Sequence, residues 1–200
     1  MEEAFTHIYE NALWGDNGNQ EYNGSSGGGS DLDFNRETYV PFLKKYIRYN
    51  DIKSVVDLGC GDFRCGPLIY NDLDVTYSGY DAYGKLIEYN SKINDPKKYA
   101  FTHLDFCNKK EEIISADMCI LKDVIQHWSL THIHDFLDYL VKSKKFKHIL
   151  ITNCGDQTID NTDIEIGEWR ALSCDFFPLK KYRPVKLYIY GVKEVSVIRC

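Results

Sequence analysis

Hydrophobic residues along the chain gather in short runs that alternate with longer amphipathic segments. Strand-like apolar runs occupy residues 54–58, 75–80, 100–104, 118–121 and 148–152. Helix-like segments lie between them at residues 66–71, 84–93, 109–114 and 131–141. Strands that alternate with helices indicate a parallel sheet whose two faces are covered by right-handed crossovers.

The two ends of the chain depart from this alternation. Residues 185–190 and 192–198 are strand-like runs separated only by a tight turn at Gly191, and antiparallel pairing alone joins strands so briefly. Residues 36–49 place apolar side chains three and four positions apart, which predicts a helix despite Pro41 near its start. We therefore expect an α/β fold with a doubly wound, mostly parallel sheet and a C-terminal antiparallel hairpin.

The first 35 residues differ in composition from the rest of the chain. Residues 5–13 predict a short amphipathic helix, and residues 16–30 are dense in Gly, Asn and Ser. Within them, residues 24–30 read Gly-Ser-Ser-Gly-Gly-Gly-Ser, a composition typical of a flexible linker. The alternative is a lid whose bare backbone closes over a ligand.

Composition and charge narrow the class of protein. The 200 residues suffice for one domain with a sizeable core, and the net charge of −6 argues against a general nucleic-acid binder. None of the seven cysteines forms a C-x-x-C pair, so we expect reduced thiols and no metal site. No signal peptide or membrane-spanning apolar segment is present, which predicts a cytoplasmic protein without a membrane partner. The oligomeric state is not predicted.

Candidate chemistry lies where the first two strand-like runs end. Residues 54–58 contain Asp57 and lead into a turn with Gly59 and Gly61, where the lack of side chains lets another molecule approach the backbone. Asp81 ends the next run. A glycine turn after one strand and a carboxylate ending the next predict binding of a nucleoside through its ribose. A purely structural turn would explain the two glycines but not Asp81.

The order of four motifs carries a family resemblance. The motifs are V-V-D-L-G-C-G-D, Y-S-G-Y-D, H-L-D-F and A-D-M-C-I-L-K-D-V-I-Q-H-W. Together they resemble class I S-adenosylmethionine (SAM)-dependent methyltransferases over residues 53–200. The resemblance implies a seven-stranded Rossmann-like sheet and SAM as cofactor. It divides the chain into an N-terminal helix with a Gly/Ser-rich lid, residues 1–35, and a SAM-binding methyltransferase domain, residues 36–200.

A narrower resemblance concerns four segments. These are Trp14-Gly15 with the glycine/serine stretch, residues 60–63, residues 123–127 and residues 164–170. They are similar to small stand-alone methyltransferases that accompany glycan or nucleotide-sugar biosynthesis, and this similarity favours the lid over the linker.

The resemblance implies roles for the residues at the strand ends. Gly59 and Gly61 would lie against the methionine part of SAM, and Asp81 would accept hydrogen bonds from both ribose hydroxyls. Asp105 would accept from the adenine amino group, although it could instead cap the segment that follows it. Phe63, standing where a third small residue is expected, predicts a bulkier turn. The full set of implied cofactor-binding residues is Asp57, Gly59, Gly61, Asp62, Asp81, Asp105, Phe106 and Lys122.

The catalytic candidates follow the fourth strand-like run. Methyl transfer from a sulfonium mainly requires that the acceptor be held in line, and a hydroxyl acceptor also benefits from a base. His127, four residues beyond Asp123, is the candidate base because its usual pKa suits proton removal near neutral pH. The alternative is a structural histidine that hydrogen-bonds the backbone. Asp123 is the second catalytic candidate.

Residues 160–170 predict a substrate loop after the fifth strand. Glu165 and Glu168 could bind sugar hydroxyls, and Trp169 could stack on a sugar. The guanidinium of Arg170 could bind a phosphate through two parallel hydrogen bonds. Trp14 could complete the wall of the site, or it could belong to the core, as could Trp128.

We therefore expect SAM-dependent O-methylation of a small-molecule acceptor, a sugar or nucleotide-linked sugar, without a nucleic-acid partner. The alternatives are a methyltransferase acting on a protein or another small metabolite, and a non-catalytic cofactor-binding subunit.

Overall fold

The computed structural model describes residues 1–160 and 162–200, and the chain divides into two compact units, residues 1–106 and 107–200. In the described part of the chain, seven strands follow the order β3-β2-β1-β4-β5-β7-β6. The strands through β5 that pair directly are parallel, and the last two are antiparallel to their neighbours. The predicted α/β sheet with a closing hairpin is confirmed.

The first unit contains three parallel strands. They are β1 (Ser54–Leu58), β2 (Thr76–Asp81) and β3 (Tyr99–His103), and β1 and β2 are in register at Val56 and Ser78. Each lies within one residue of its predicted position; β1 and β2 are largely buried, whereas most residues of β3 are exposed. The helices of this unit are α1 (Glu2–Glu10), η1 (Gly28–Ser30), α2 (Leu32–Arg36), α3 (Tyr39–Tyr49), α4 (Gly66–Tyr70) and α5 (Gly84–Ile93).

The helix predicted over residues 36–49 begins only at Tyr39. Pro41 lies in the first turn of α3, where a backbone N–H has no partner within the helix and its absence costs nothing. In a helix that began at residue 36, position 41 would need an N–H to donate to the carbonyl oxygen of residue 37, and proline has none. Residues 37 and 38 therefore separate α2 from α3. Asp31 caps α2 by accepting the Phe34 N–H at 2.8 Å.

Phe63 corrects the expectation of a bulkier turn. Its backbone is left-handed, with φ of 53°, and its ring lies in the core rather than over the turn. The ring centroid is 4.7 Å from that of Tyr77 and 5.0 Å from that of Phe101. A Cβ on Gly66 would come within 2.0 Å of the same ring, so the glycine makes room for it. Phe63 thus anchors the turn to the aromatic core.

The second unit contains β4 (Ala116–Lys122), β5 (Phe146–Cys154), β6 (Val185–Tyr190) and β7 (Lys193–Arg199). Strand β5 pairs in parallel with β4 and antiparallel with β7, where Cys154 lies opposite Lys193. Its helices are η2 (Lys110–Glu112), η3 (Ile125–His127), α6 (Leu130–Ser143) and η4 (Leu179–Tyr182).

The helix predicted over residues 109–114 is wrong. A single 3₁₀ turn, η2, stands there, because Ile113 leaves the turn in an extended conformation and buries its side chain.

Among the described residues, no helix combines the length and apolar character required to cross a bilayer.

Candidate functional site

The glycine turn after β1 holds the Asp81 carboxylate. Gly59 and Gly61 have φ angles of 81° and 55°, in the left-handed region that favours glycine. The Gly61 N–H donates to Oδ2 of Asp81 at 3.0 Å, and the Tyr83 N–H donates to Oδ1 at 3.1 Å. The two oxygens carry four lone pairs together, so these bonds fix the carboxylate without using all of its accepting capacity.

Asp81 is buried at this position, with 7% of its surface exposed. Burial raises the pKa of its carboxyl group, and the backbone N–H bonds from Tyr83 and Gly61 oppose that shift without cancelling it. Charge-assisted hydrogen bonds gain strength in such a dry environment. The position is therefore suited to a ligand with two adjacent hydroxyl groups.

Two other acidic residues of the turn have protein partners. Oδ2 of Asp57 accepts the Tyr77 hydroxyl at 2.9 Å. Asp62 is 3.0 Å from Nε of Arg64, and its backbone N–H donates to Oγ of Ser26 at 2.9 Å. Both carboxylates lie beside the turn, and their role in binding the cofactor stays a prediction.

Asp105 and Phe106 follow β3 and are both buried. Oδ2 of Asp105 accepts the backbone N–H of Glu2 at 3.0 Å, in the first turn of α1. Asp105 thus takes a capping role toward α1, an element far from it in sequence. Its predicted role as acceptor for an adenine amino group stays a prediction.

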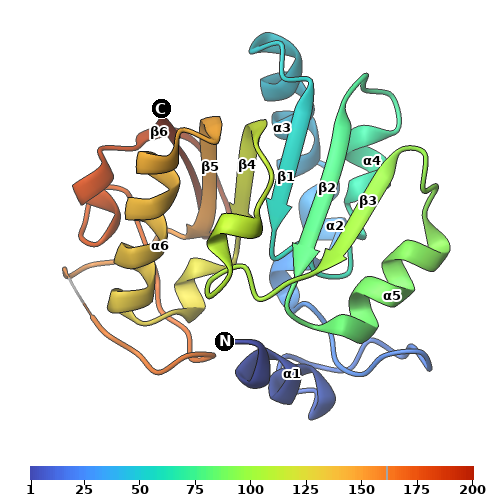
Figure 1. The fold of residues 1–200 in the computed structure, drawn as a ribbon. Helices are drawn as coiled ribbons and strands as arrows, with labels where there is room; N and C mark the ends of the chain where they lie inside the picture. Colours follow the sequence, from blue (N-terminus) through green and yellow to red (C-terminus); the bar gives the residue numbers. More distant parts are fainter. Residues whose placement is uncertain (161) are drawn as a thin grey trace. The chain divides into compact units, whose positions relative to one another are not determined.

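The N-terminal segment lies against the turn, and Figure 1 places α1 beyond the carboxyl ends of β2 and β3. The Tyr9 ring stacks on Tyr83 with centroids 4.6 Å apart, and its hydroxyl lies 2.9 Å from Oγ of Ser26. A Cβ on Gly61 would come within 2.7 Å of that Oγ. Trp14 packs edge-on against Tyr9 at 6.1 Å. The segment thus packs against the turn, and its role as a lid stays a prediction.

In the second unit, Lys122 and Asp123 stand where β4 ends. Asp123 has φ of 59°, a conformation that costs a residue other than glycine about 1–2 kcal/mol. Its carboxylate lies 3.1 Å from Nζ of Lys122 and 2.5 Å from Nζ of Lys193. Burial alone would raise the pKa of Asp123, but the two lysine charges outweigh it and hold the pKa below its usual value.

His127 is buried in η3 with both ring nitrogens near protein groups. Nδ1 lies 2.8 Å from the Glu168 carbonyl oxygen, which requires Nδ1 to donate. Nε2 lies 3.3 Å from the amide nitrogen of Gln126, whose oxygen accepts the Cys154 N–H at 3.0 Å and so fixes the amide orientation. Burial lowers the pKa of His127. The imidazole is therefore neutral at neutral pH, with Nε2 as its accepting nitrogen.

The predicted substrate loop separates into an anchored and an exposed part; residue 161 lies outside the described residues. Arg170 is 6% exposed, and its guanidinium donates to the carbonyl oxygens of Thr162 at 2.6 Å and Trp128 at 2.5 Å. This geometry anchors the loop and gives no support to the bidentate phosphate contact predicted for Arg170. Trp169 is 53% exposed, and Oε2 of Glu168 accepts the Glu165 N–H at 2.9 Å. These three side chains remain on the surface.

Trp128 belongs to the core. It is 1% exposed, and its ring packs edge-on against Phe136 at 5.1 Å. The alternative of a site wall is thereby excluded for this residue.

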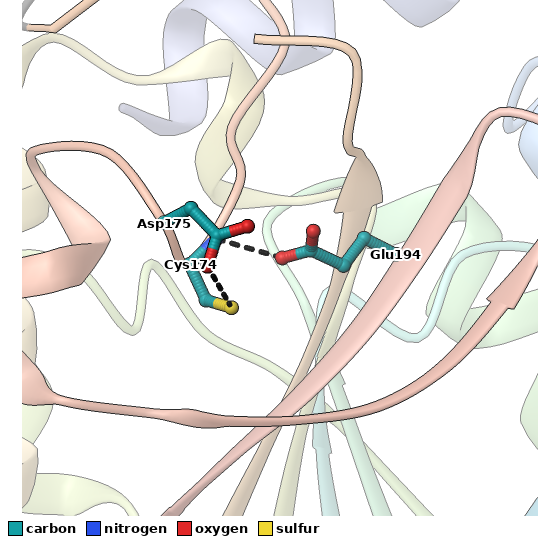
Figure 2. Close-up of side chains that lie close together, drawn as sticks. All are labelled: Cys174, Asp175 and Glu194. Carbon is teal, nitrogen blue, oxygen red and sulfur yellow. Dashed lines mark hydrogen bonds between the residues drawn. The ribbon is translucent and has the colours of Figure 1, made fainter.

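Cys174, Asp175 and Glu194 bring potential metal ligands together (Figure 2). Glu194 accepts the Cys174 N–H at 2.7 Å, and Lys186 lies 2.8 Å from Glu194 and 2.5 Å from Asp175. Burial, followed by the hydrogen bond to Glu194, raises the pKa of the Cys174 thiol to about 12. A protonated thiol and carboxylates paired with an ammonium make poor metal ligands, so the cluster carries no argument for a metal site.

Comparison with known proteins identifies the fold. No protein-family model matches the sequence, and no curated protein is similar to it. Among solved structures, human N-acetylserotonin methyltransferase in complex with SAM matches with a TM-score of 0.63 at 12% identity, over 81% of this chain and 51% of that one. The methyltransferase domain of bacterial CtHen1-C matches with a TM-score of 0.62 at 14% identity, over 84% of this chain and 98% of that one.

The chain shares the α/β fold of these solved structures. DhpI, solved in complex with S-adenosylhomocysteine (SAH), also matches, with a TM-score of 0.64 at 10% identity over 85% of this chain and 87% of that one. The chain spans about half the length of the human enzyme. Identities this low establish the fold alone.

Within this fold, the structure brings forward three residues that the sequence did not single out. Asn90 is fully buried on α5 and donates to the Gly61 carbonyl oxygen at 2.8 Å, which supports the turn. Ser26 contacts the same turn, and Lys193 pairs with Asp123. A polar residue on an apolar face was the available signal for Asn90, beside Leu86 and Ile87.

Proposed function

We propose that this chain is a SAM-dependent methyltransferase that acts on a small hydroxylated acceptor. The observation that carries the proposal is the Asp81 carboxylate at the end of β2, buried and fixed by the N–H groups of Gly61 and Tyr83. SAM supplies the chemistry as an activated methyl group on a sulfonium. The protein then has to bind SAM and the acceptor, orient the two toward each other and exclude water from the site.

The residues of the first unit fit this cofactor. The remaining lone pairs of Asp81 match two ribose hydroxyls, and Gly59 and Gly61 offer backbone without side chains to the methionine part. Asp105 and Phe106 offer an acceptor and an apolar ring for adenine. The SAM and SAH complexes of two proteins with this fold support the same cofactor here.

For proton removal from the acceptor we propose Nε2 of His127. The bond from Nδ1 to the Glu168 carbonyl oxygen selects the tautomer that a base at Nε2 requires. An acceptor hydroxyl would have to take the place of the Gln126 amide, whose contact of 3.3 Å is long for a hydrogen bond. A purely structural His127 is the alternative.

The proposed acceptor class is a sugar or nucleotide-linked sugar. Trp169 presents an exposed indole, and Glu165 and Glu168 lie beside it in the same loop. An exposed aromatic face and carboxylates in the same loop suit a sugar ring with hydroxyl groups around it. Small-metabolite and peptide acceptors are the competing outcomes of the test.

The test combines calorimetric titration with S-adenosylhomocysteine (SAH) and transfer of a labelled methyl group to sugars, nucleotide sugars, small metabolites and peptides. His127→Gln is expected to lower kcat by about 10²–10⁴-fold with unchanged SAH affinity, whereas His132→Gln on α6 should match the wild type. Lack of SAH binding would contradict the proposed function. Wild-type turnover by His127→Gln would leave the function standing and reject the base.

Cofactor binding should also depend on pH. Burial raises the pKa of Asp81, so on acidification this carboxylate is protonated at a higher pH than an ordinary aspartate. A protonated Asp81 cannot accept from both ribose hydroxyls, and SAH affinity should therefore fall as the pH is lowered toward and below that pKa. Titrations between pH 8 and the onset of acid unfolding check this. Constant affinity across the whole range would contradict it.

A further inference from the structure

Lys193 is a buried lysine that the proposed reaction has not used. It is the first residue of β7, opposite Cys154 at the end of β5, and its side chain is 7% exposed. A buried ammonium is costly unless charged or polar groups surround it. Its Nζ donates to Oδ1 of Asp123 at 2.5 Å and to Sγ of Cys154 at 3.2 Å. One side chain thus joins the ends of β4, β5 and β7.

The partner of Lys193 is held in a strained conformation. Asp123 has a left-handed backbone and a side chain that is 13% exposed. Its other oxygen, Oδ2, lies 3.1 Å from Nζ of Lys122. Strained backbone persists only where the surroundings hold it, and such positions cluster at functional sites. The two lysines supply that hold on the carboxylate.

This ion pair lies close enough to the His127 ring to influence its charge. Burial lowers the pKa of His127 most, the Asp123 carboxylate raises it, and the Lys193 ammonium lowers it. Glu168 contacts the ring through its backbone carbonyl oxygen, while its carboxylate accepts the Glu165 N–H. The protonation of His127 is therefore sensitive to whether the charge on Asp123 is balanced.

We infer that Lys193 is a positioning residue: its ammonium holds the Asp123 carboxylate at the end of β4 and balances its charge beside His127. This inference rests on the proposed function, in which His127 takes a proton from the acceptor. With Asp123 balanced, the imidazole stays neutral and Nε2 keeps a lone pair for that proton. Without Lys193, the carboxylate would favour imidazolium, which cannot act as a base.

The test follows the imidazole signal of His127 by NMR in histidine-labelled protein across pH, with His127→Gln as assignment control. Lys193→Met is expected to shift the His127 titration to higher pH, and Asp123→Asn to lower pH. Lys193→Arg, which retains the charge, should restore the wild-type titration. Lys186→Met removes another ion-paired lysine, on β6, and should leave it unchanged.

A kinetic readout connects the electrostatics to transfer. The acidic limb of the kcat/KM profile of Lys193→Met should move to higher pH, with a larger loss of rate at pH 6 than at pH 8. Unchanged His127 titration in both Lys193→Met and Asp123→Asn would overturn the inference. Shifted titration with an unmoved kinetic limb would overturn it as well. The NMR experiment needs no cofactor, so its result does not depend on SAH binding. Failure of the protein to bind SAH would instead reject the proposed function. If Lys193→Met does not fold, Asp123→Asn and Lys193→Arg still decide the outcome.

Discussion

Replacement of Asp81 by asparagine should weaken SAH binding by at least about 100-fold. The substitution keeps the shape of the side chain but removes the charge and one accepting oxygen, so the ribose diol loses its paired acceptor. Hydrogen bonds to a charged group are each worth about 1.5–3 kcal/mol. Loss of two such bonds amounts to about 3–6 kcal/mol, and each 1.4 kcal/mol is tenfold in affinity. Calorimetric titration of wild type and variant measures the difference.

The matched control for this experiment is Asp74→Asn, a surface aspartate shortly before β2. It removes the same charge from the same unit and should bind SAH as the wild type does. Asp81→Asn should remain folded, because burial disfavours the charged form of Asp81 and the variant no longer carries that charge. Affinities of Asp81→Asn and wild type that agree within twofold would contradict the role given to Asp81.

The second large effect concerns stability. Phe63→Ala should lower the free energy of unfolding by about 3–5 kcal/mol, the range for removal of a buried phenylalanine. The ring contacts Tyr77, Tyr99 and Phe101 and fills the space over Gly66, so its loss leaves a cavity that the sheet cannot close. Urea unfolding, followed by fluorescence and circular dichroism, measures the change.

Two further variants serve as comparisons for Phe63→Ala. Phe63→Leu retains most of the volume and should cost less than Phe63→Ala. Tyr49→Ala removes an aromatic ring that is 87% exposed and should leave stability unchanged. A loss of less than 1 kcal/mol in Phe63→Ala would mean that the ring does not anchor the turn.

The sequence predicted those parts of the fold that depend on local pattern. Strand β1 and helix α5 have the predicted bounds, because a buried run and an amphipathic face leave a periodic record in the sequence. The turn with Gly59 and Gly61 and the carboxylate of Asp81 also meet as expected. The rule that strand ends share one edge of a parallel sheet requires no tertiary detail.

Side-chain direction could not be predicted in this way. Phe63 turns into the core, and Arg170 donates to the carbonyl oxygens of Thr162 and Trp128, although their residue types alone fit a bulky turn and a phosphate ligand. Lys193 begins the largely buried strand β7, and only the pairing of β5 with β7 brings it to Asp123. Such positions depend on contacts between residues far apart in the chain.

A crystal structure of the protein with SAH would show whether SAM binds at the turn after β1. We expect ribose hydroxyls within hydrogen-bond distance of both Asp81 oxygens and the amino acid end of the ligand beside Gly59 and Gly61. Ser26, which now contacts Gly61, should be displaced from the turn. SAH bound at another place, with Tyr9 and Ser26 still packed on the turn, would contradict binding at this turn.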